Sequence, residues 1–160
     1  MILAMVGTHN QQFNRLLKEL DELAGSGKIR EEIFAQTGSS DFEPKNYRTQ
    51  RMLSLQEYKK LIKKAGIVIT HGGAGSIIDV LNEKKRLIIV PRLAKFGEHT
   101  NDHQLDLADA LGRQGKAIVV KDIKQLGKAL KDIKKKNLGF GKSSMLGAEL
   151  RKSILEFSRS

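Results

Sequence analysis

Apolar residues along the chain alternate between short dense runs and longer stretches in which they recur every three or four positions. The short runs, together with one more polar segment, are predicted as strands at residues 2–6, 33–37, 50–53, 67–70, 87–90 and 117–120. The recurrent pattern predicts helices over residues 13–23, 55–65, 76–81, 105–111, 123–133 and 144–158. Strands that alternate with helices indicate a largely parallel sheet with helices on both faces, which is a Rossmann-like α/β fold.

Length and composition indicate one globular domain. The chain has 160 residues, of which 39% are hydrophobic, so residues 1–160 can form a single core that the segment 144–158 closes. No cysteine is present, which excludes a disulfide framework and a thiolate site. The first residues have no basic stretch before their apolar run, and that run is too short to cross a membrane.

The formal net charge of +11 is large for a chain of this length. It implies attraction to an acidic partner, which can be nucleic acid, anionic lipid or an acidic protein. Only 5% of the residues are aromatic, which argues against a single-strand binder that stacks bases on aromatic rings. One face of the segment from Asp122 onward is basic. It carries Lys124, Lys128, Lys131 and Lys135, and this face is either simply solvated or contacts anionic lipid or a partner.

Two turns that contain glycine connect strands to the helices that follow them. His-Gly-Gly at 71–73 separates the strand at 67–70 from the apolar helix residues at 76–81. Such a turn aims the free N–H groups and the positive dipole end of the helix at a phosphate, although the glycines could also serve only to permit a tight bend. In the earlier turn at 7–10, Thr8 is either an N-cap or a ligand contact.

The loop after the strand at 87–90 is rich in hydrogen-bonding side chains. Open α/β sheets bind ligands at the carboxyl ends of their strands, so these side chains are candidate ligand contacts. They are Glu98, His99, Asn101, Asp102, His103 and Gln104. The imidazoles of His99 and His103 beside Asp102 can alternatively be interpreted as a metal site.

Several of these motifs occur together in one known family. His-Gly-Gly-x-x-Ser-x-x-Asp from residue 71, a strand that ends at Pro91, and Asp-x-Gln at 102–104 resemble the donor-binding half of GT-B glycosyltransferases that use UDP-sugars. The opening run VGTHNQQFNRL resembles small bacterial glycosyltransferase subunits from capsule and exopolysaccharide pathways. The chain is also similar to the small subunit of the dolichol-pathway N-acetylglucosaminyltransferase. The resemblance is good up to about residue 120 and loose beyond it.

The resemblance implies a donor site and a role for each residue in it. The turn and helix N-terminus at 71–76 would cradle the diphosphate, and Asp79 would bind the ribose hydroxyls. Asp102 and Gln104 would contact the sugar, and the uracil is expected near residues 51–53. The donor-binding residues are thus predicted as Gly7, Thr8, Met52, His71, Gly72, Gly73, Ala74, Gly75, Ser76, Asp79, Asp102 and Gln104.

The resemblance also implies a reaction. A hexose, either galactose or N-acetylglucosamine, would pass from a UDP-sugar to a lipid-linked saccharide with inversion, in polysaccharide biosynthesis. Fixed N–H donors at the helix N-terminus would stabilise the charge that grows on the leaving diphosphate, so neither a metal nor another cofactor is expected. His71 is a candidate catalytic residue because it can donate to the diphosphate. His9 is the candidate general base on this chain, while the main base is expected on a partner.

A complete GT-B enzyme has two such domains, and this chain begins on the first strand of the donor half. The resemblance therefore implies a separate, membrane-associated subunit that binds the lipid-linked saccharide acceptor. Through that subunit the chain is expected in the cytoplasm, peripheral at the membrane, with no nucleic acid as a partner. Two alternatives remain open: a non-catalytic subunit that binds a UDP-sugar or enhances its partner, and a basic nucleic-acid-binding protein.

Overall fold

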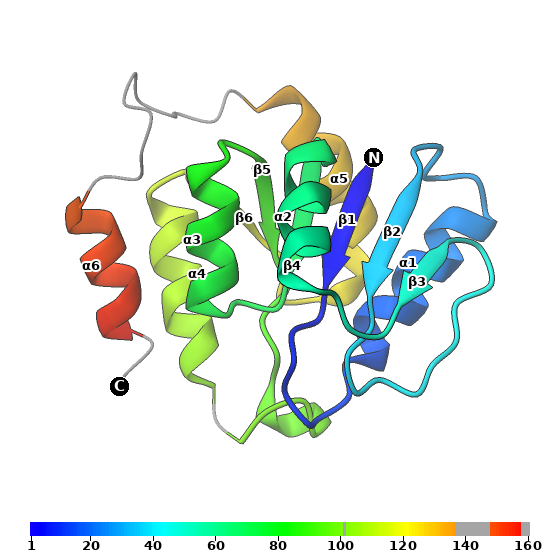
Figure 1. The fold of residues 1–160 in the computed structure, drawn as a ribbon, viewed down its shortest axis with the longest axis horizontal. Helices are drawn as coiled ribbons and strands as arrows, with labels where there is room; N and C mark the ends of the chain where they lie inside the picture. The colour runs from blue at the N-terminus through cyan, green and yellow to red at the C-terminus, as the bar shows by residue number, and fades with distance from the viewer. Residues whose placement is uncertain (101, 137–147, 158–160) are drawn as a thin grey trace.

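The computed structural model describes residues 1–100, 102–136 and 148–157 (Figure 1). Within these residues, six parallel strands form one sheet in the order β3-β2-β1-β4-β5-β6. The strands are β1 Ile2–Met5, β2 Ile33–Gln36, β3 Arg48–Gln50, β4 Ile67–Thr70, β5 Arg86–Ile89 and β6 Ile118–Val119. The strand order reverses between β1 and β4, which is the doubly wound arrangement. The predicted Rossmann-like α/β fold is confirmed.

Helices cover both faces of the sheet. They are α1 Asn14–Gly25, α2 Leu55–Lys64, α3 Ala74–Asn82, α4 His103–Arg113, α5 Leu126–Lys135 and α6 Ala148–Phe157, with short 3-10 helices η1 Ala94–Phe96 and η2 Ile123–Gln125. Figure 1 shows α2 and α3 in front of the sheet and α5 behind it. Side chains of a strand alternate between the two faces, so neighbours in β1 join different cores. Ala4 packs with residues of α1 and α5, whereas Leu3 packs with residues of α2, α3, α4 and α6.

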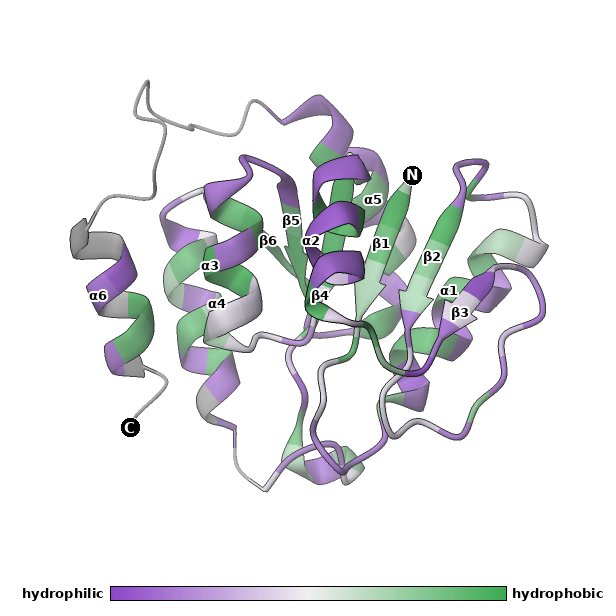
Figure 2. Ribbon diagram, viewed as in Figure 1, coloured by the Kyte–Doolittle hydropathy of each residue, from purple (hydrophilic) through white to green (hydrophobic). Residues whose placement is uncertain are grey.

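Helix α2 is the most polar cover of the sheet. In Figure 2 the central strands β1, β4 and β5 are mainly hydrophobic, while α2 is largely hydrophilic. Ile62 is the residue of α2 that is buried. A capping box fixes the start of the helix, because Ser54 Oγ accepts from Glu57 N at 3.2 Å and Glu57 Oε2 accepts from Ser54 N at 2.8 Å. The predicted start of this helix at residue 55 is thus confirmed.

Some predicted boundaries were wrong. The third strand spans Arg48–Gln50 rather than 50–53. The prediction missed its position because all three residues of this edge strand are exposed and carry no apolar pattern. Helices α3 and α4 begin at Ala74 and His103, earlier than the predicted 76 and 105, since the first turn of a helix does not need apolar residues. The described part of the closing helix begins at Ala148, and the predicted residues 144–147 lie outside the described residues.

The loops that follow β1, β2, β4 and β5 meet at the carboxyl edge of the sheet. Met5, at the end of β1, is in register with Gln36 and with Thr70. Thr70, at the end of β4, is in register with Ile89. Ligands bind doubly wound sheets at this edge, where the strand order reverses. The fold therefore places the turn after β1 beside the turn after β4 at the position of a ligand site.

The closing helix α6 packs on its own chain. Ile154 is 1% exposed and lies in the core that includes residues of α3 and α4. The next residue, Leu155, is 37% exposed. None of the helices in the described residues combines the length and the apolar content needed to cross a membrane.

Replacing Ile154 with Ala is expected to lower the free energy of unfolding by about 2–5 kcal/mol, because it leaves a cavity in a packed core. Leu155→Ala, one position further on the more exposed side of the helix, is the matched control and should cost clearly less. Urea denaturation of both variants measures the difference. Equal losses for the two variants would contradict the docking of α6 through Ile154.

Candidate functional site

A cavity of about 480 Å³ opens at the carboxyl edge, between the turn after β1, the start of α2 and the turn after β4. Part of its lining was predicted as donor-binding residues: Gly7, Thr8, His71, Gly73, Gly75 and Ser76. The other residues that line it are Met5, Gln36, Leu53, Leu55 and Tyr58. The structure thus brings the turns after β1 and β4 together around one cavity.

The N-terminus of α3 faces this cavity without a capping side chain. Its N-cap is Gly73, which makes no side-chain capping hydrogen bond. The first bond of the helix runs from Ile77 N to Gly73 O at 3.1 Å, so the N–H groups of Ala74, Gly75 and Ser76 have no intrahelical acceptor. Gly75 and Ser76 also line the cavity. Unpaired N–H groups and the positive end of the helix dipole favour an anionic ligand here.

The imidazole of His71 lies between two glycines, one from each turn. A Cβ added to Gly7 would lie 2.6 Å from His71 Cε1, and a Cβ added to Gly73 would lie 2.5 Å from His71 Nε2. Gly7 also has a φ of +86°, which side chains rarely adopt. Glycine is therefore required at Gly7 by both its backbone and its neighbour, and at Gly73 by the neighbour alone.

His71 is neutral near neutral pH. Its pKa is lowered to about 4, mainly by burial, next by the nearby positive charge of Arg92, and to a smaller extent by His99 and His9. A hydrogen bond to the Met5 backbone acts in the opposite direction. A group with so low a pKa is a poor general base at neutral pH. A neutral imidazole has one N–H, and the hydrogen bond to the Met5 backbone already uses it. The predicted donation from His71 to the diphosphate therefore stays a prediction.

Gln36, at the end of β2, holds the turn after β1 through both atoms of its amide. Gly7 N donates to Gln36 Oε1 at 3.1 Å, and Gln36 Nε2 donates to Gly7 O at 2.9 Å. The same nitrogen lies 3.2 Å from Arg51 O. Sequence reasoning missed this residue because it ends an apolar strand and was given no role of its own. A polar residue at the last position of a buried strand was the available signal.

Tyr58 connects α2 to α3 beside the cavity. Its hydroxyl donates to Asp79 Oδ2 at 2.9 Å. Burial and the charge of Asp79 raise the pKa of Tyr58, while a hydrogen bond with the Ser76 side chain acts in the opposite direction, so the phenol stays protonated. Asp79 itself is exposed, and it is not among the residues that line the cavity. Tyr58 was missed as a site residue because its helical spacing indicated a packing role.

The predicted sugar contacts lie on the β5 side of the edge, outside the residues that line the cavity. Asp102 Oδ1 accepts from Ala94 N at 2.9 Å, so this carboxylate holds the start of η1. The side chain of Gln104 lies against Gly72, because a Cβ added there would be 3.3 Å from Gln104 Cβ. Gln104 Oε1 is buried and has no hydrogen-bond partner within the described residues, so it keeps an unused acceptor.

Other residues of the predicted site also lie outside the lining of the cavity. Met52 is 54% exposed. His9 is exposed, and its ring centroid lies 4.9 Å from that of His99. Ala74 is the first residue of α3, and its backbone N–H is one of those without an intrahelical acceptor. The alternative metal site is untested, because the side chain of His103 and all of Asn101 lie outside the described residues.

The expectation that Glu98 contacts a ligand was wrong. Its side chain is 1% exposed and forms two hydrogen bonds with Arg15, both of 2.9 Å. Glu98 Oε2 also accepts from Leu93 N at 3.1 Å. A buried carboxylate that is fully paired within the fold stabilises the loop and leaves no oxygen for a ligand.

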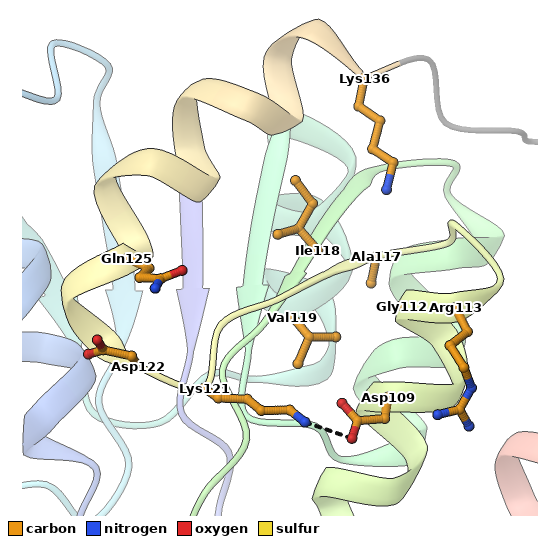
Figure 3. Close-up of a pocket in the computed structure, with 10 residues that line it drawn as sticks. All are labelled: Asp109, Gly112, Arg113, Ala117, Ile118, Val119, Lys121, Asp122, Gln125 and Lys136. Atoms are coloured by element: carbon orange, nitrogen blue, oxygen red, sulfur yellow. Dashed lines mark hydrogen bonds and ion pairs between the residues drawn. The ribbon is translucent and has the colours of Figure 1, made fainter.

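A second cavity, of about 710 Å³, lies along the edge strand β6 (Figure 3). It is lined by Asp109, Gly112, Arg113, Ala117, Ile118, Val119, Lys121, Asp122, Gln125 and Lys136. Lys121 and Asp109 form an ion pair of 2.8 Å across it. None of the predicted site residues lines this cavity, and its charges are of both signs. The cavity between the turns after β1 and β4 is therefore the stronger candidate for the functional site.

Comparison with known proteins shows the family to which this chain belongs. The family model of the glycosyltransferase family 28 C-terminal domain matches residues 1–156. The UDP-N-acetylglucosamine transferase subunit ALG13 of Mus musculus is 34% identical over 88 residues, which are 52% of this chain and 7% of that protein. The chain thus spans only a small part of this relative.

Solved structures show the same fold at low identity. MurG of Acinetobacter baumannii has a TM-score of 0.58 and 16% identity, over 98% of this chain and 44% of that one. The glycosyltransferase SsfS6 of Streptomyces sp. SF2575, solved with thymidine diphosphate, has a TM-score of 0.56 and 16% identity, over 99% of this chain and 36% of that one. Since the family match extends from the first strand into the closing helix, this chain belongs to the glycosyltransferase family 28 C-terminal domain family.

Proposed function

We propose that this chain is the donor-binding subunit of a UDP-sugar-dependent glycosyltransferase. It holds the UDP-sugar while a hexose is transferred, with inversion, to a lipid-linked saccharide of a polysaccharide pathway. A separate, membrane-associated subunit binds the acceptor, and through it the chain works at the cytoplasmic face of the membrane. Family membership makes the chain a glycosyltransferase domain. The donor, the acceptor and the partner are the proposed parts.

The observation that carries the proposal is the cavity at the uncapped N-terminus of α3. The N–H groups of Ala74, Gly75 and Ser76 lack intrahelical acceptors, and Gly75 and Ser76 line the cavity. None of the described residues that line the cavity is a carboxylate. A diphosphate placed there would meet N–H donors and a positive helix end without a repelling charge. The same donors would stabilise the leaving diphosphate without a metal.

The relatives support the choice of donor. SsfS6, which shares the fold, was solved with thymidine diphosphate, a pyrimidine nucleoside diphosphate. ALG13 is named as a UDP-N-acetylglucosamine transferase subunit. N-acetylglucosamine is therefore the first sugar to test and galactose the second. The uracil ring would lie near Leu53 and Leu55, which form the apolar part of the cavity wall on the α2 side.

The electrostatics of the cavity support a second subunit. An acceptor hydroxyl must lose a proton during transfer, and a base for this step needs a pKa near the working pH. The pKa of His71, about 4, is too low for that role. His9 is exposed beside His99, outside the residues that line the cavity. The main base is thus assigned to the acceptor-binding partner.

The lack of a suitable general base among the described residues that line the cavity also favours a second candidate function. This is a subunit that binds a UDP-sugar or enhances its partner without taking part in the chemical step. A cavity without a base suits both functions. They differ in turnover, because a non-catalytic subunit leaves the rate of its partner unchanged when its own diphosphate contacts are removed.

Isothermal titration of the purified chain with UDP, UDP-N-acetylglucosamine, UDP-galactose and UDP-glucose tests the donor site. We expect UDP to bind and one of the first two sugars to bind better than UDP alone. A Ser76→Ala variant should keep its melting temperature and bind UDP more weakly. Absence of UDP binding by the folded wild-type chain would contradict the proposed function.

Asp79→Ala is expected to weaken UDP binding at least about tenfold, because a hydrogen bond from a ribose hydroxyl to a charged acceptor contributes about 1.5–3 kcal/mol. Asp79 accepts from Tyr58 through Oδ2, which leaves Oδ1 for the ribose. Since the side chain is exposed, the melting temperature should change little. Isothermal titration and thermal melts measure the two effects.

Tyr58→Phe is the matched control for this prediction. It removes the hydroxyl that bonds Asp79 but keeps the ring that lines the cavity. Its UDP affinity should fall less than that of Asp79→Ala. The ribose role of Asp79 is wrong if Asp79→Ala loses thermal stability and binds UDP as the wild type does.

A further inference from the structure

We propose that Arg92 is a positioning residue, which holds the segment 6–12 after β1 in the conformation that the nucleotide cavity requires. This segment, called the β1 loop below, contains Gly7 and Thr8, both of which line the cavity. The inference rests on the proposed function and extends it to a residue that lies outside the cavity and touches no ligand.

Arg92 bonds both ends of the β1 loop. Its side chain is fully buried, at 0% exposure, just after β5. Nη2 and Nε donate to Val6 O at 2.7 and 3.3 Å, at the start of the loop. Nη1 donates to Gln11 O at 2.9 Å and to Gln12 O at 3.1 Å, at its end. The guanidinium therefore fixes the distance between the two ends of the loop.

The same group also ties the β1 loop to the loop after β5. Arg92 Nη1 lies 2.8 Å from Glu98 O, and the backbone N of Arg92 lies 3.4 Å from His71 O. The Glu98 carboxylate is in turn held by Arg15. Arg92 Cζ lies 5.0 Å from the centroid of the Phe13 ring, which adds a cation–π contact on one face. The guanidinium thus holds the β1 loop and the loop after β5 together, while the backbone of Arg92 contacts the turn after β4.

Only an arginine has donors with the geometry for these contacts. The guanidinium is planar, always charged and presents several N–H groups in a rigid fork, so one side chain can satisfy carbonyls that point from different directions. A lysine ammonium is a compact group on a flexible stem and reaches fewer of them. Without Arg92, the carbonyls of Val6, Gln11 and Gln12 would be left without this donor in a buried environment, and the loop would rearrange.

The position of the β1 loop decides the shape of the cavity. Gly7 packs against the ring of His71 so closely that an added Cβ would lie 2.6 Å from it. A shift of the loop by a fraction of that distance would close or open the space between the turns after β1 and β4. The charge of Arg92 also helps to keep His71 neutral, because it lowers the pKa of that imidazole.

The test compares Arg92→Lys with Arg15→Lys, two substitutions that keep a positive charge in the same buried network. Arg15 bonds Glu98 and Pro91 O, on the β5 side. We expect both variants to fold with a lower melting temperature. Only Arg92→Lys should lose UDP affinity, by at least about tenfold in isothermal titration, while Arg15→Lys stays within about twofold of the wild type.

Two spectroscopic signals separate positioning from general stability. The amide resonances of Gly7 and Thr8 should shift in Arg92→Lys and stay in place in Arg15→Lys. The ring of His71 should titrate as in the wild type in Arg92→Lys, because the charge remains, and at higher pH in Arg92→Met, because the charge is lost. A role in stability alone would move none of these signals selectively.

The proposal is overturned if folded Arg92→Lys binds UDP within about twofold of the wild type, or if Arg15→Lys loses the same affinity. It is also overturned if Arg92→Lys does not fold, since Arg92 would then be a residue of general stability. If the wild type does not bind UDP at all, the proposed function fails by itself. The resonances of Gly7, Thr8 and His71 would still decide whether Arg92 positions the loop.

Discussion

Mixed with a UDP-sugar and a lipid-linked acceptor, the purified chain alone is expected to transfer sugar at least about a hundredfold more slowly than the chain with its acceptor-binding partner. General base catalysis contributes about 10²–10⁴-fold to such reactions, and none of the described residues that line the cavity can supply it. His71 is too weak a base, with a pKa of about 4. The acceptor would also lack the second domain that orients it, which adds to the loss.

The assay needs the chain alone, the partner alone and both together, with release of UDP and formation of the glycosylated lipid measured separately. Activity of the mixture with none in either protein alone supports the proposed division of labour. Turnover of about 1 s⁻¹ or more by the isolated chain, the lower end of ordinary enzyme rates, would refute it. A mixture whose rate is unaffected by a diphosphate-site variant of this chain would favour the non-catalytic alternative.

The fold was predictable because its signals are local. Buried strands such as 67–70 appear as unbroken apolar runs, and the helices between them keep their apolar spacing, so the order of elements follows from the pattern. The exception was the edge strand Arg48–Gln50, whose side chains are all exposed. An edge strand is held by backbone hydrogen bonds on one side, and its side chains need not show the apolar pattern that predicts a strand.

The site was predictable only where a motif is contiguous. Residues 71–76 form a turn and a helix start within a few positions, and the structure places most of them around the cavity. Gln36 and Arg92 act through backbone atoms of segments far away in the chain, as in the bond from Arg92 to Val6 O. Such contacts produce no recognisable pattern of residue spacing in the sequence. For the same reason Glu98 was misread as a ligand contact, since its partner Arg15 lies on another element.

Gly73→Ala is expected to weaken UDP binding at least about a hundredfold while the chain stays folded. The backbone of Gly73 has φ −68° and ψ 129°, a conformation that alanine adopts without strain. The conflict is with the side chain of His71, whose Nε2 would lie 2.5 Å from the new Cβ. Either the ring moves, or the turn that begins α3 moves away from the ring. In both cases the diphosphate would lose its fit to the N–H groups at the start of α3. Two misaligned charged hydrogen bonds, at about 1.5–3 kcal/mol each, give this loss.

Gly66→Ala is the matched control for this last prediction. Gly66 precedes β4 at the opposite edge of the sheet, and the nearest atom to an added Cβ is Met1 O at 4.0 Å, an ordinary contact. This variant should melt at or slightly above the temperature of the wild type, because alanine reduces the entropy of the unfolded chain, and it should bind UDP normally. Isothermal titration with UDP and thermal melts of both variants separate the ligand effect from the fold. Unchanged UDP affinity in a folded Gly73→Ala variant would mean that the diphosphate does not bind between the ring of His71 and the N-terminus of α3, and the cavity would have to serve another ligand.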